Sequence, residues 1–392
     1  MREETLDALV VGGGMAGLAL TAQLAADGRR VACVDAGPRP GPEAAENDRR
    51  VTAVLMPGVD TLRRTGAWDA IEPRAAPMLG LRVLDCGGAH PIPREDVTFE
   101  AAEIRDGPFG WSVENAKARA ALADAVDDAP GAEAIWGTRV IRWLARRDAV
   151  IATLSDGRTL RAKVICGVDG KRSATREAAG IGHRRTAYGQ KAIACRVTHE
   201  RDHEGISIEM HHVGGPLTFA PLPGRASGVV WMNPDRDADR LIALDDEGFL
   251  RALQESSQGI MGTIRSVEAR AHWPMETVVA NAMHAPRCAL LGEAAHAFPP
   301  IGAQGFNLSL RDVESFAEAT AGAADMGEAG LLGSWARSRG ADVWVRALAV
   351  DALNRSVRTS LRPVRDLRRA GLGLLGRFEP LRRGVMRFGM GG

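Results

Sequence analysis

The sequence predicts an α/β fold in which a nucleotide-binding domain is interleaved with a β-sheet domain and followed by C-terminal helices. Three observations predict it: an opening strand, glycine turn and helix; mainly β patterns over residues 183–275; and a helical, basic stretch over residues 341–392. A chain of 392 residues, 45% apolar and 25% charged, suits two packed domains and excludes a disordered protein. Its net charge of +1 gives no reason to expect a nucleic-acid partner.

The opening segment has the pattern of a buried parallel strand followed by a helix. LDALVV (6–11) is a continuous apolar run, which suits a strand covered on both faces. GGGMAG (12–17) predicts a tight turn, and the helix after it is expected to end at Gly28. RRVACVD (29–35) is the expected second strand.

Gly12, Gly14 and Gly17 form the G-x-G-x-x-G pattern of a dinucleotide-binding turn. Gly12 permits the turn, Gly14 lets the backbone approach a pyrophosphate, and Gly17 lets the helix pack closely on the strand. The first N–H groups of the helix favour an anion. Asp35, at the end of the second strand, can accept hydrogen bonds from ribose hydroxyls. The pattern does not distinguish NAD from FAD.

The remaining elements alternate between helix and strand. Residues 114–129 have apolar side chains at i+4 spacing and predict a helix, and residues 138–166 alternate as strands around a turn at 155–157. CALLG (288–292) predicts a buried strand, and residues 306–319 predict a helix. The expected domains are residues 1–75, 100–182 and 276–345 for nucleotide binding, residues 76–99 and 183–275 for a β-rich substrate domain, and residues 346–392 for a C-terminal basic helical region.

A second motif, GVDGKRSATR (167–176), follows a predicted strand and has the form D-G-x-x-S-x-x-R, beginning at Asp169. Taken alone it predicts only a turn.

A third motif, LLGEAAHAFPPIGAQGFNLSLRDV (290–313), brings Glu293 to the C-terminal end of a strand, where α/β sheets bind ligands. Gly302 and Gly305 have no side chain, so the backbone at these positions can approach a flat or bulky ligand closely. The N–H groups at the start of the next helix, near Phe306, favour negative charge.

In this order and spacing, the three motifs resemble the FAD-dependent aromatic hydroxylases of the para-hydroxybenzoate-hydroxylase type. QGFNLSLRDV (304–313) is similar to the GQGFNLGLRDV of the ubiquinone-biosynthesis hydroxylase family, and the similarity covers essentially the whole chain. It extends to WSVENAKARAAL (111–122), YGQKAIACRV (188–197), GPLTFAPLP (215–223) and MRFGMGG (386–392). The resemblance implies that the nucleotide-binding domain is a Rossmann-like FAD-binding domain.

The resemblance also assigns cofactor contacts, with the N–H groups of Phe306 and Asn307 expected at the pyrimidine oxygen of the flavin. Glu293 departs from the usual Asp of this class, and Ala303 and Ser309 replace common glycines. The residues carried over as cofactor-binding are Gly12, Gly14, Met15, Ala16, Gly17, Asp35, Arg50, Asn115, Asp169, Gly292, Glu293, Pro299, Gly302, Gln304, Gly305, Phe306 and Asn307.

The implied reaction is the hydroxylation of a phenolic ring, most simply a polyprenylated phenol of ubiquinone biosynthesis. NAD(P)H would reduce FAD, dioxygen would give a flavin hydroperoxide, and the electron-rich ring would attack it. This chemistry needs a dry apolar pocket beside the flavin, with Phe298, Pro299 and Pro300 as its expected wall. His211 is a further pocket candidate, but its pattern is that of an exposed histidine at a strand end. No general base is assigned.

The cysteine and histidine patterns predict neither a disulfide framework nor a metal site. Five cysteines are scattered without a CxxC, which suits a reducing compartment. His199 and His203 have helical metal-ligand spacing, but they lie in a strand-and-loop pattern. The acidic start does not resemble a signal peptide. The sequence also has no stretch of about 18 continuous apolar residues, the length that a membrane-spanning helix needs. The expected location is cytoplasmic, with peripheral contact at the inner face of the membrane.

That contact is expected from the basic tail. Residues 355–392 hold ten arginines against two acidic residues, a net charge of +8. A stripe of Arg358, Arg362, Arg365 and Arg369 would share one helix face beside apolar residues, which suits an anionic lipid surface. The partners expected are therefore an aromatic substrate, an anionic membrane surface and other ubiquinone-pathway proteins.

Alternative interpretations remain at this point. One is the same chemistry on a small soluble aromatic or a secondary metabolite, which would need a closed polar pocket with an arginine for a carboxylate. Others are a flavin-dependent prenyl reductase, an NAD-only dehydrogenase, and a non-catalytic scaffold protein that keeps a flavin site. The segment from Glu293 to Asn307 argues against the dehydrogenase.

Overall fold

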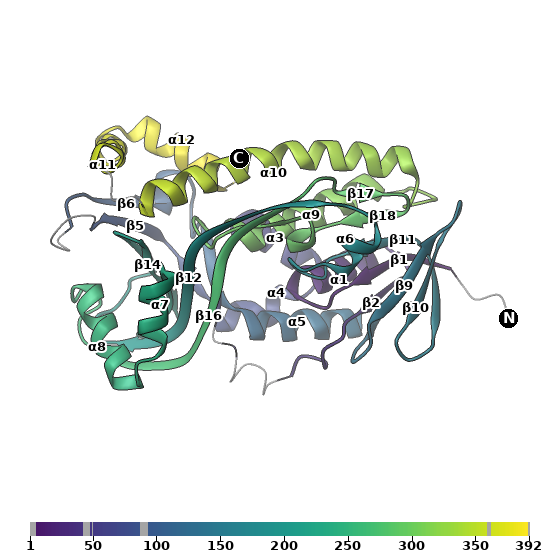
Figure 1. Cartoon of the computed structure of the whole chain (residues 1–392), viewed down its shortest axis with the longest axis horizontal. Helices are drawn as coiled ribbons and strands as arrows, with labels where there is room; N and C mark the ends of the chain where they lie inside the picture. Colours follow the sequence, from purple (N-terminus) through teal and green to yellow (C-terminus); the bar gives the residue numbers. More distant parts are fainter. Residues whose placement is uncertain (1–4, 42–47, 49, 87–92, 359–361, 391–392) are drawn as a thin grey trace.

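The computed structural model describes residues 5–41, 48, 50–86, 93–358 and 362–390, and these fold around three β-sheets (Figure 1). The α/β class, with a nucleotide-binding sheet, a second β-sheet and C-terminal helices, is confirmed. The domain boundaries given above stay a prediction.

The first sheet carries the nucleotide-binding motifs. Its parallel strands lie in the order β18 (Cys288–Leu290), β11 (Thr159–Gly167), β1 (Leu6–Val11), β2 (Val31–Val34) and β8 (Ala132–Ile135). Antiparallel strands β9 (Val140–Ala145), β10 (Val150–Leu154) and β17 (His284–Ala285) extend it. The predicted strand at 6–11 and the hairpin turn at 155–157 are confirmed.

Helices cover this sheet and explain why its strands are continuously apolar. Helix α1 (Met15–Ala26) packs against α5 (Asn115–Asp128) and α9 (Gln304–Thr320). Leu9, Leu18, Leu122 and Phe316 are fully buried in the shared core. Parallel strands buried on both faces need such runs, because neither face meets water.

The second sheet has eight strands and lies beside the first. Two strands of 17 residues, β12 (His183–His199) and β16 (Ile264–Ala280), run through it and curve along the molecule (Figure 1). β16 pairs with β19 (His296–Ala297), which belongs to the third motif. The other strands, in order from β12, are β15 (Ala226–Pro234), β14 (Gly215–Leu222), β13 (Ile206–His212), β5 (Gly80–Asp85) and β6 (Asp96–Glu100).

Two helices interrupt the region that was expected to be mainly β. Helices α7 (Asp235–Ile242) and α8 (Asp246–Ser257) cover one face of the second sheet, where Trp231 packs edge-on against Phe249. The Asp245 side chain caps α8 by accepting from the N–H of Gly248. Both helices are stabilised because their apolar side chains pack on the apolar face of this sheet.

A third, three-stranded sheet contacts β14 of the second sheet and helices α5 and α9. It consists of β3 (Val51–Leu55), β7 (Gly110–Glu114) and β4 (Ala76–Met78). The chain near the third sheet also holds helices α3 (Met56–Arg64) and α4 (Trp68–Ile71) and two 3₁₀ turns (Glu72–Arg74 and Ala101–Glu103). Helix α6 (Ala174–Ala178) follows β11, and a 3₁₀ turn (Gly292–Ala294) follows β18.

Three helices close the chain: α10 (Ala329–Arg358), α11 (Arg362–Arg377) and α12 (Glu379–Met390). Figure 1 shows α10 running over the second sheet toward α11. The predicted arginine stripe does not lie on one helix, because Arg358 belongs to α10 whereas Arg362, Arg365 and Arg369 belong to α11. The side chains of Arg358, Arg362 and Arg365 lie outside the described part of the chain. None of the helices in the described part of the chain combines the length and apolarity needed to cross a bilayer.

Candidate active site

The three motifs converge at the carboxyl ends of neighbouring parallel strands. β1, β11 and β18 are adjacent in the first sheet, so the segments that follow them share one edge. A Cβ on Gly12 would lie 2.6 Å from the carbonyl oxygen of Val168, and a Cβ on Gly292 would lie 3.7 Å from the Cβ of Ala16. This edge is where open α/β sheets bind their ligands.

The fingerprint glycines have the positions that a dinucleotide turn requires. Gly12 has a φ of +111°, which favours glycine, and Gly17 faces the carbonyl oxygen of Gly12 so closely that a side chain would overlap it. Gly14 differs, because a Cβ there would meet no heavy atom within 4 Å. The backbone at Gly14 is therefore open to a ligand.

The first turn of α1 points its unpaired N–H groups at that open space. Gly14 is the N-cap of α1 and supplies no side-chain cap, so Met15, Ala16 and Gly17 keep N–H groups without intrahelical partners. These donors and the positive end of the helix dipole favour an anion. The open backbone and the uncapped helix together fit the pyrophosphate of a dinucleotide.

Asp35 closes the other side of this turn. Its carboxylate accepts the N–H of Gly13 at 2.6 Å and the N–H of Gly37 at 2.8 Å. Arg119 lies 3.7 Å from the same carboxylate and donates to the carbonyl oxygen of Gly13 at 2.7 Å. Asp35 therefore shapes the turn as well as facing the expected ribose position.

Two residues beside Asp35 were not predicted. The guanidinium of Arg119 lies over the ring of Trp136, 5.7 Å from its centroid. The Nε1–H of Trp136 is buried and has no hydrogen-bond partner among the described residues. No local pattern marks either residue, because the contact joins α5 to the end of β8.

Asp169 in the second motif is engaged within its own turn. Its carboxylate accepts from the backbone N–H of Thr175 at 2.9 Å, the hydroxyl of Thr175 at 3.0 Å and the hydroxyl of Ser173. Arg176 is buried and donates to the carbonyl oxygen of Ala294 at 2.8 Å, which ties the second motif to the third. A Cβ on Gly170 would lie 4.0 Å from the Glu293 carboxylate.

Arg50 faces the same region as Glu293. Arg50 pairs with Asp48 at 2.7 Å, and this hydrogen bond raises the pKa of Arg50, as does the nearby charge of Glu293. Glu293 itself is exposed. Asn115 donates its backbone N–H to the carbonyl oxygen of Arg50 at 2.9 Å, and its side chain accepts from Thr52 at 2.7 Å. The structure thus brings Arg50, Asn115 and Glu293 to one side of the site.

The start of α9 offers a second set of unpaired N–H groups. Ala303 is its N-cap, with no side-chain cap bond, and has the left-handed φ of +56°. Gly302 before it has a φ of +64° and is exposed. Gly305 and Phe306 lie in the first turn of α9, where backbone N–H groups lack intrahelical partners. The side chain of Gln304 lies outside the described part of the chain.

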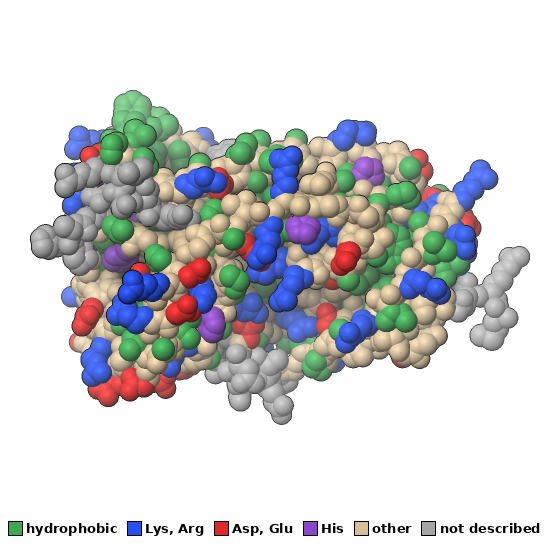
Figure 2. Space-filling view, viewed as in Figure 1, with side chains coloured by type: hydrophobic (Ala, Val, Ile, Leu, Met, Phe, Trp, Pro, Cys, Tyr) green, Lys and Arg blue, Asp and Glu red, His purple; other side chains and the backbone are tan. Residues whose placement is uncertain are grey.

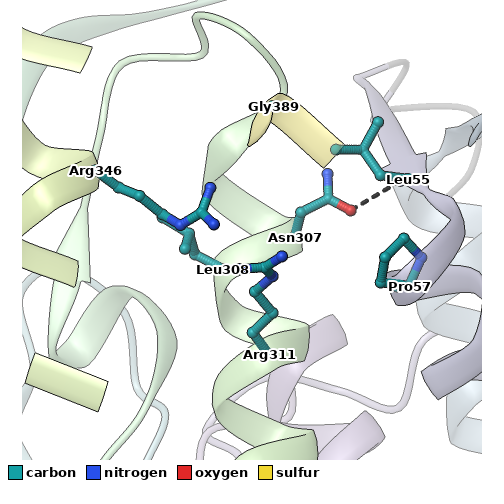
Figure 3. Close-up of a pocket in the computed structure, with 8 residues that line it drawn as sticks. Leu55, Pro57, Asn307, Leu308, Arg311, Arg346 and Gly389 are labelled. Atoms are coloured by element: carbon teal, nitrogen blue, oxygen red, sulfur yellow. Dashed lines mark hydrogen bonds between the residues drawn. The ribbon is translucent and has the colours of Figure 1, made fainter. Parts of the chain in front are cut away.

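The Asn307 side chain fastens α9 to the third sheet. Its Oδ1 accepts the N–H of Leu55 at 2.8 Å, and its Nδ2 donates to the carbonyl oxygens of Ala53 at 2.7 Å and Ala303 at 2.6 Å. Only its backbone N–H is left for the contact predicted from the sequence. A small pocket beside it receives the side chains of Arg311 and Arg346 (Figure 3); its lining is Leu55, Pro57, Gly58, Asn307, Leu308, Arg311, Arg346 and Gly389.

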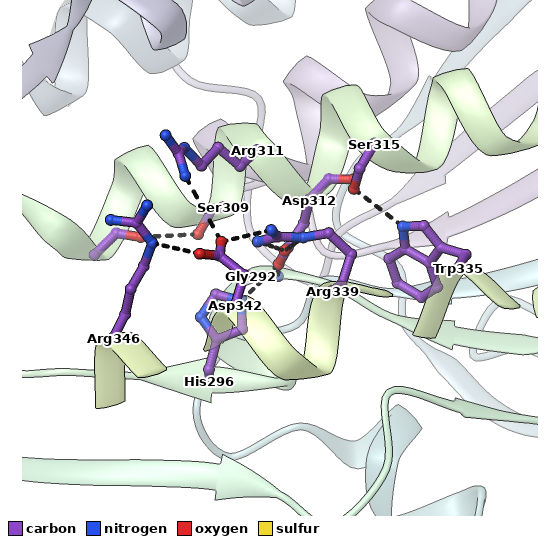
Figure 4. Close-up of polar contacts among 11 residues, drawn as sticks. Gly292, His296, Ser309, Arg311, Asp312, Ser315, Trp335, Arg339, Asp342 and Arg346 are labelled. Carbon is purple, nitrogen blue, oxygen red and sulfur yellow. Dashed lines mark hydrogen bonds and ion pairs between the residues drawn. The ribbon is translucent and has the colours of Figure 1, made fainter. Parts of the chain in front are cut away.

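A buried carboxylate that was not predicted holds the third motif together. Asp312 accepts from Gly292 N–H at 2.9 Å and pairs with His296 at 2.6 Å and Arg339 at 2.7 Å (Figure 4). Burial alone would raise the pKa of Asp312, but the charges of His296 and Arg339 and the hydrogen bonds from His296 and from the N–H of Gly292 lower it below its usual range. Asp312 belongs to the LRDV segment that carried the resemblance, which is the only sequence signal for it.

The predicted pocket wall has an apolar neighbour in the second sheet. Phe298 is half-buried and stacks on His296, with ring centroids 5.7 Å apart, whereas Pro299 is buried and Pro300 is exposed. Ile301 next to them packs in a small apolar cluster with Tyr188, Ala192, Met232 and Met275. This cluster connects the loop of the third motif to the second sheet.

The histidines differ from their predicted positions. The prediction that His211 is exposed is wrong: it is 4% exposed, because β13 lies between β14 and β5 inside the sheet. The ring nitrogens of His199 are hydrogen-bonded to Arg201 and Ser227, and His203 contacts the carbonyl oxygen of Leu222. Within the described ranges, no three acidic, histidine or cysteine side chains could hold a metal together.

Comparison with sequence families gives one match along most of the chain, to the FAD binding domain family over residues 5–345. The chain is 35% identical to the ubiquinone hydroxylase UbiL of Rhodospirillum rubrum over 99% of its own length and 90% of the relative. It is 28% identical to the 3-demethoxyubiquinol 3-hydroxylase of Escherichia coli, with both chains covered completely.

Solved structures with the same fold are more distant in sequence. The p-nitrophenol 4-monooxygenase PnpA of Pseudomonas putida superposes with a TM-score of 0.82 at 20% identity, covering 100% of this chain and 99% of the other. PqsL of Pseudomonas aeruginosa in complex with 2-aminobenzoylacetate gives a TM-score of 0.77 at 22% identity, covering 94% and 99%.

Proposed function

The chain belongs to the FAD-binding family of ubiquinone-biosynthesis hydroxylases, and on that premise we propose that it inserts one oxygen atom into the ring of a polyprenylated phenol. It is an FAD-dependent aromatic-ring monooxygenase that uses NAD(P)H and dioxygen. The single observation that carries the substrate proposal is full-length similarity to hydroxylases named for ubiquinone and its precursors.

The residues at the edge of the first sheet fit FAD. Gly12, Gly14 and Gly17 with the start of α1 would hold the pyrophosphate, and Asp35 the adenosine ribose. Arg50, Asn115, Asp169 and Glu293 would surround the middle of the cofactor, and the first turn of α9 would meet its pyrimidine end. FAD supplies the electron transfer and the activation of dioxygen when it is bound.

The protein's own part is to bind the phenol, orient it and exclude water. The cluster around Ile301 supports this, because Tyr188, Met232 and Met275 give an apolar surface beside the loop that precedes α9. The only tyrosine of the chain, Tyr188, donates its hydroxyl to Asp351 of α10 at 2.8 Å. This bond ties α10 to the second sheet beside the expected ring position.

A membrane surface is the proposed source of so apolar a substrate. Leu367 of α11 is 73% exposed, and Leu374 and Phe378 are 53% and 58% exposed. Figure 2 shows apolar side chains gathered over the corner formed by α11 and α12. Arg377 and Arg387 are exposed on the same two helices. An exposed apolar face next to arginines suits the headgroup region of an anionic bilayer.

Quinone profiling of cells that lack the gene tests this function. Cells without the enzyme should accumulate a prenylated phenol that lacks one hydroxyl group, and expression of the intact chain should remove it. An unchanged quinone profile, in cells shown to express the protein normally before deletion, would contradict the proposed substrate and favour a soluble aromatic compound.

A further inference from the structure

A row of paired residues crosses the second sheet from β5 to β16. His211 is in register with Asp85 on one side and Pro216 on the other, and Ala192 is in register with Met232 and with Trp273. Leu217 pairs with Trp231, so Pro216 lies opposite Met232 and completes the row. Residues in such a row share one face of the sheet.

This row faces the cofactor loop and not α7 and α8. Met210, Leu217 and Trp231 pack in the core beneath α7 and α8, so their sequence neighbours His211, Pro216 and Met232 point to the opposite face. Met232 packs there with Ile301 of the loop before α9. Two strand spacings, about 10 Å, separate His211 from Met232, with Pro216 between them.

His211 forms a dyad with Glu209 on this face. The two residues are two apart on β13, and His211 Nε2 lies 2.6 Å from a Glu209 carboxylate oxygen. An ionised carboxylate only accepts, so Nε2 carries a proton, and in the neutral imidazole Nδ1 is then the acceptor. Nδ1 is buried and meets no hydrogen-bond partner in the described structure. The dyad thus presents an unused acceptor within a closed environment.

The other charged groups near the dyad are paired. Asp85 lies beside His211 in the row and forms an ion pair with Arg368 of α11 at 2.6 Å, with both side chains buried. On α10, Asp351 accepts from Tyr188. His212 points the other way, toward Ser256 of α8. Glu209 is therefore the carboxylate that interacts electrostatically with His211.

Helix α10 packs against β13 and β14 and carries a second unused polar group. Arg368 donates to the carbonyl oxygens of Ser356 and Val357, which holds the end of α10 near Asp85. Asn354 lies between this anchor and Asp351 and is fully buried, yet neither atom of its amide has a hydrogen-bond partner within the described residues. A phenol bound here would find one acceptor on the sheet and one amide on the helix.

We infer that the His211–Glu209 dyad is the general base that takes the proton of the phenol substrate. The inference rests on the proposed function. The phenol O–H bond breaks, the proton joins His211 Nδ1, and the electron pair stays on the phenolate oxygen. Glu209 stabilises the imidazolium that forms, and the proton returns to the product oxygen or to water. The phenolate makes the ring carbons more electron-rich and hence ready to attack an electrophilic oxygen.

The test measures the ionisation of a bound phenol rather than turnover alone. The holoenzyme is titrated with 4-nitrophenol, whose phenolate absorbs visible light, and difference spectra against pH give the ionisation midpoint of the bound probe. In the wild type this midpoint should lie about one pH unit below that of the free probe, a tenfold effect. In His211→Gln it should return to the free value or rise above it, and Glu209→Gln should fall between.

Turnover of a short-chain prenylated phenol gives the second readout. His211→Gln should lose about 100-fold in kcat near pH 7, and the deficit should shrink as rising pH ionises the phenol in solution. His212→Gln is the matched control, because that ring faces α8, and it should keep the wild-type midpoint and kcat. All variants should retain wild-type FAD content.

Two results contradict the account in different ways. Equal midpoints in the wild type, His211→Gln and Glu209→Gln would overturn the dyad and leave the hydroxylase function standing, since phenol would still stimulate NAD(P)H oxidation. A wild-type protein that carries FAD but neither binds nor oxidises a phenol would overturn the proposed function itself.

Discussion

The backbone N–H of Gly292 donates to the carboxylate of Asp312 at 2.9 Å, and this bond joins the end of β18 to the middle of α9. The two segments flank the expected flavin position, Glu293 on one side and the first turn of α9 on the other. The same carboxylate binds His296 and, through Arg339, helix α10. One buried charge therefore sets the relative positions of three parts of the site.

Asp312→Asn should destabilise the protein by about 3 kcal/mol, because it leaves the buried Arg339 with one carboxylate fewer. Urea unfolding of the two proteins measures the difference. Asp60→Asn is the matched control, since Asp60 pairs with Arg63 on the surface and should change stability by less than about 1 kcal/mol. Equal midpoints for Asp312→Asn and the wild type would show that the Asp312 network contributes little.

The carboxylate of Asp312 should also affect how the stability of the protein depends on pH. The pKa of Asp312 is lowered in the folded protein, so its contribution is complete above the unfolded value of about 3.9 and is lost as the pH falls through the folded value. The free energy of unfolding of the wild type should therefore fall more steeply below about pH 4 than that of Asp312→Asn. Parallel curves would contradict this assignment.

Ala303→Gly should stabilise the protein by about 1 kcal/mol. Ala303 has a left-handed φ of +56°, which costs a side chain about that much and costs glycine nothing. Ala321→Gly, at the other end of α9 with a φ of −57°, is the control and should lower stability. Thermal or urea unfolding decides, and a loss of stability in Ala303→Gly would mean that the surrounding loop needs the methyl group.

Gly14→Val should abolish FAD binding without unfolding the protein. The position has an ordinary φ of −74° and no heavy atom within 4 Å of a Cβ, so the valine fits the chain but fills the approach to the pyrophosphate. Gly340→Val, at another open glycine on α10, should bind FAD normally. Flavin content after gel filtration is the measurement, and wild-type content in Gly14→Val would place the pyrophosphate elsewhere.

Replacing Leu367, Leu374 and Phe378 together by serine should weaken binding to phosphatidylglycerol-containing vesicles at least about tenfold, because each side chain loses apolar contact with the bilayer. Ile141→Ser with Leu144→Ser is the control, since these side chains are 60% and 49% exposed but lie on β9, at the opposite end of the molecule from α11 (Figure 1). Vesicle flotation measures both. Unchanged binding of the triple variant would exclude α11 as the membrane contact.

The sequence predicted those parts of the fold that depend on local patterns. The strand at 6–11, the helix at 114–129 and the glycines at 12, 14 and 17 are encoded by neighbouring residues, and the structure agrees with each. Helices α7 and α8 were not predicted, because short helices that cover a sheet are stabilised mainly by the surface beneath them.

The sequence predicted those residues of the candidate site that belong to a motif. It did not predict contacts between residues that are far apart in the sequence. Asp312 meets Arg339 across 27 residues and His296 across 16, and Arg119 meets Gly13 across 106. His211 was expected to be exposed because nothing in its local pattern shows that β5, 126 residues earlier at Asp85, covers one side of β13. Such neighbours follow only from the assembled sheet.

The insertion of oxygen is tested most directly by isotope labelling. The purified protein, loaded with FAD, is incubated with NAD(P)H, a prenylated phenol and dioxygen of the heavy oxygen isotope, and the product is analysed by mass spectrometry. The product should carry one labelled oxygen atom in a new ring hydroxyl group. A product without label, or NAD(P)H oxidation that yields only hydrogen peroxide with every prenylated phenol, would contradict it.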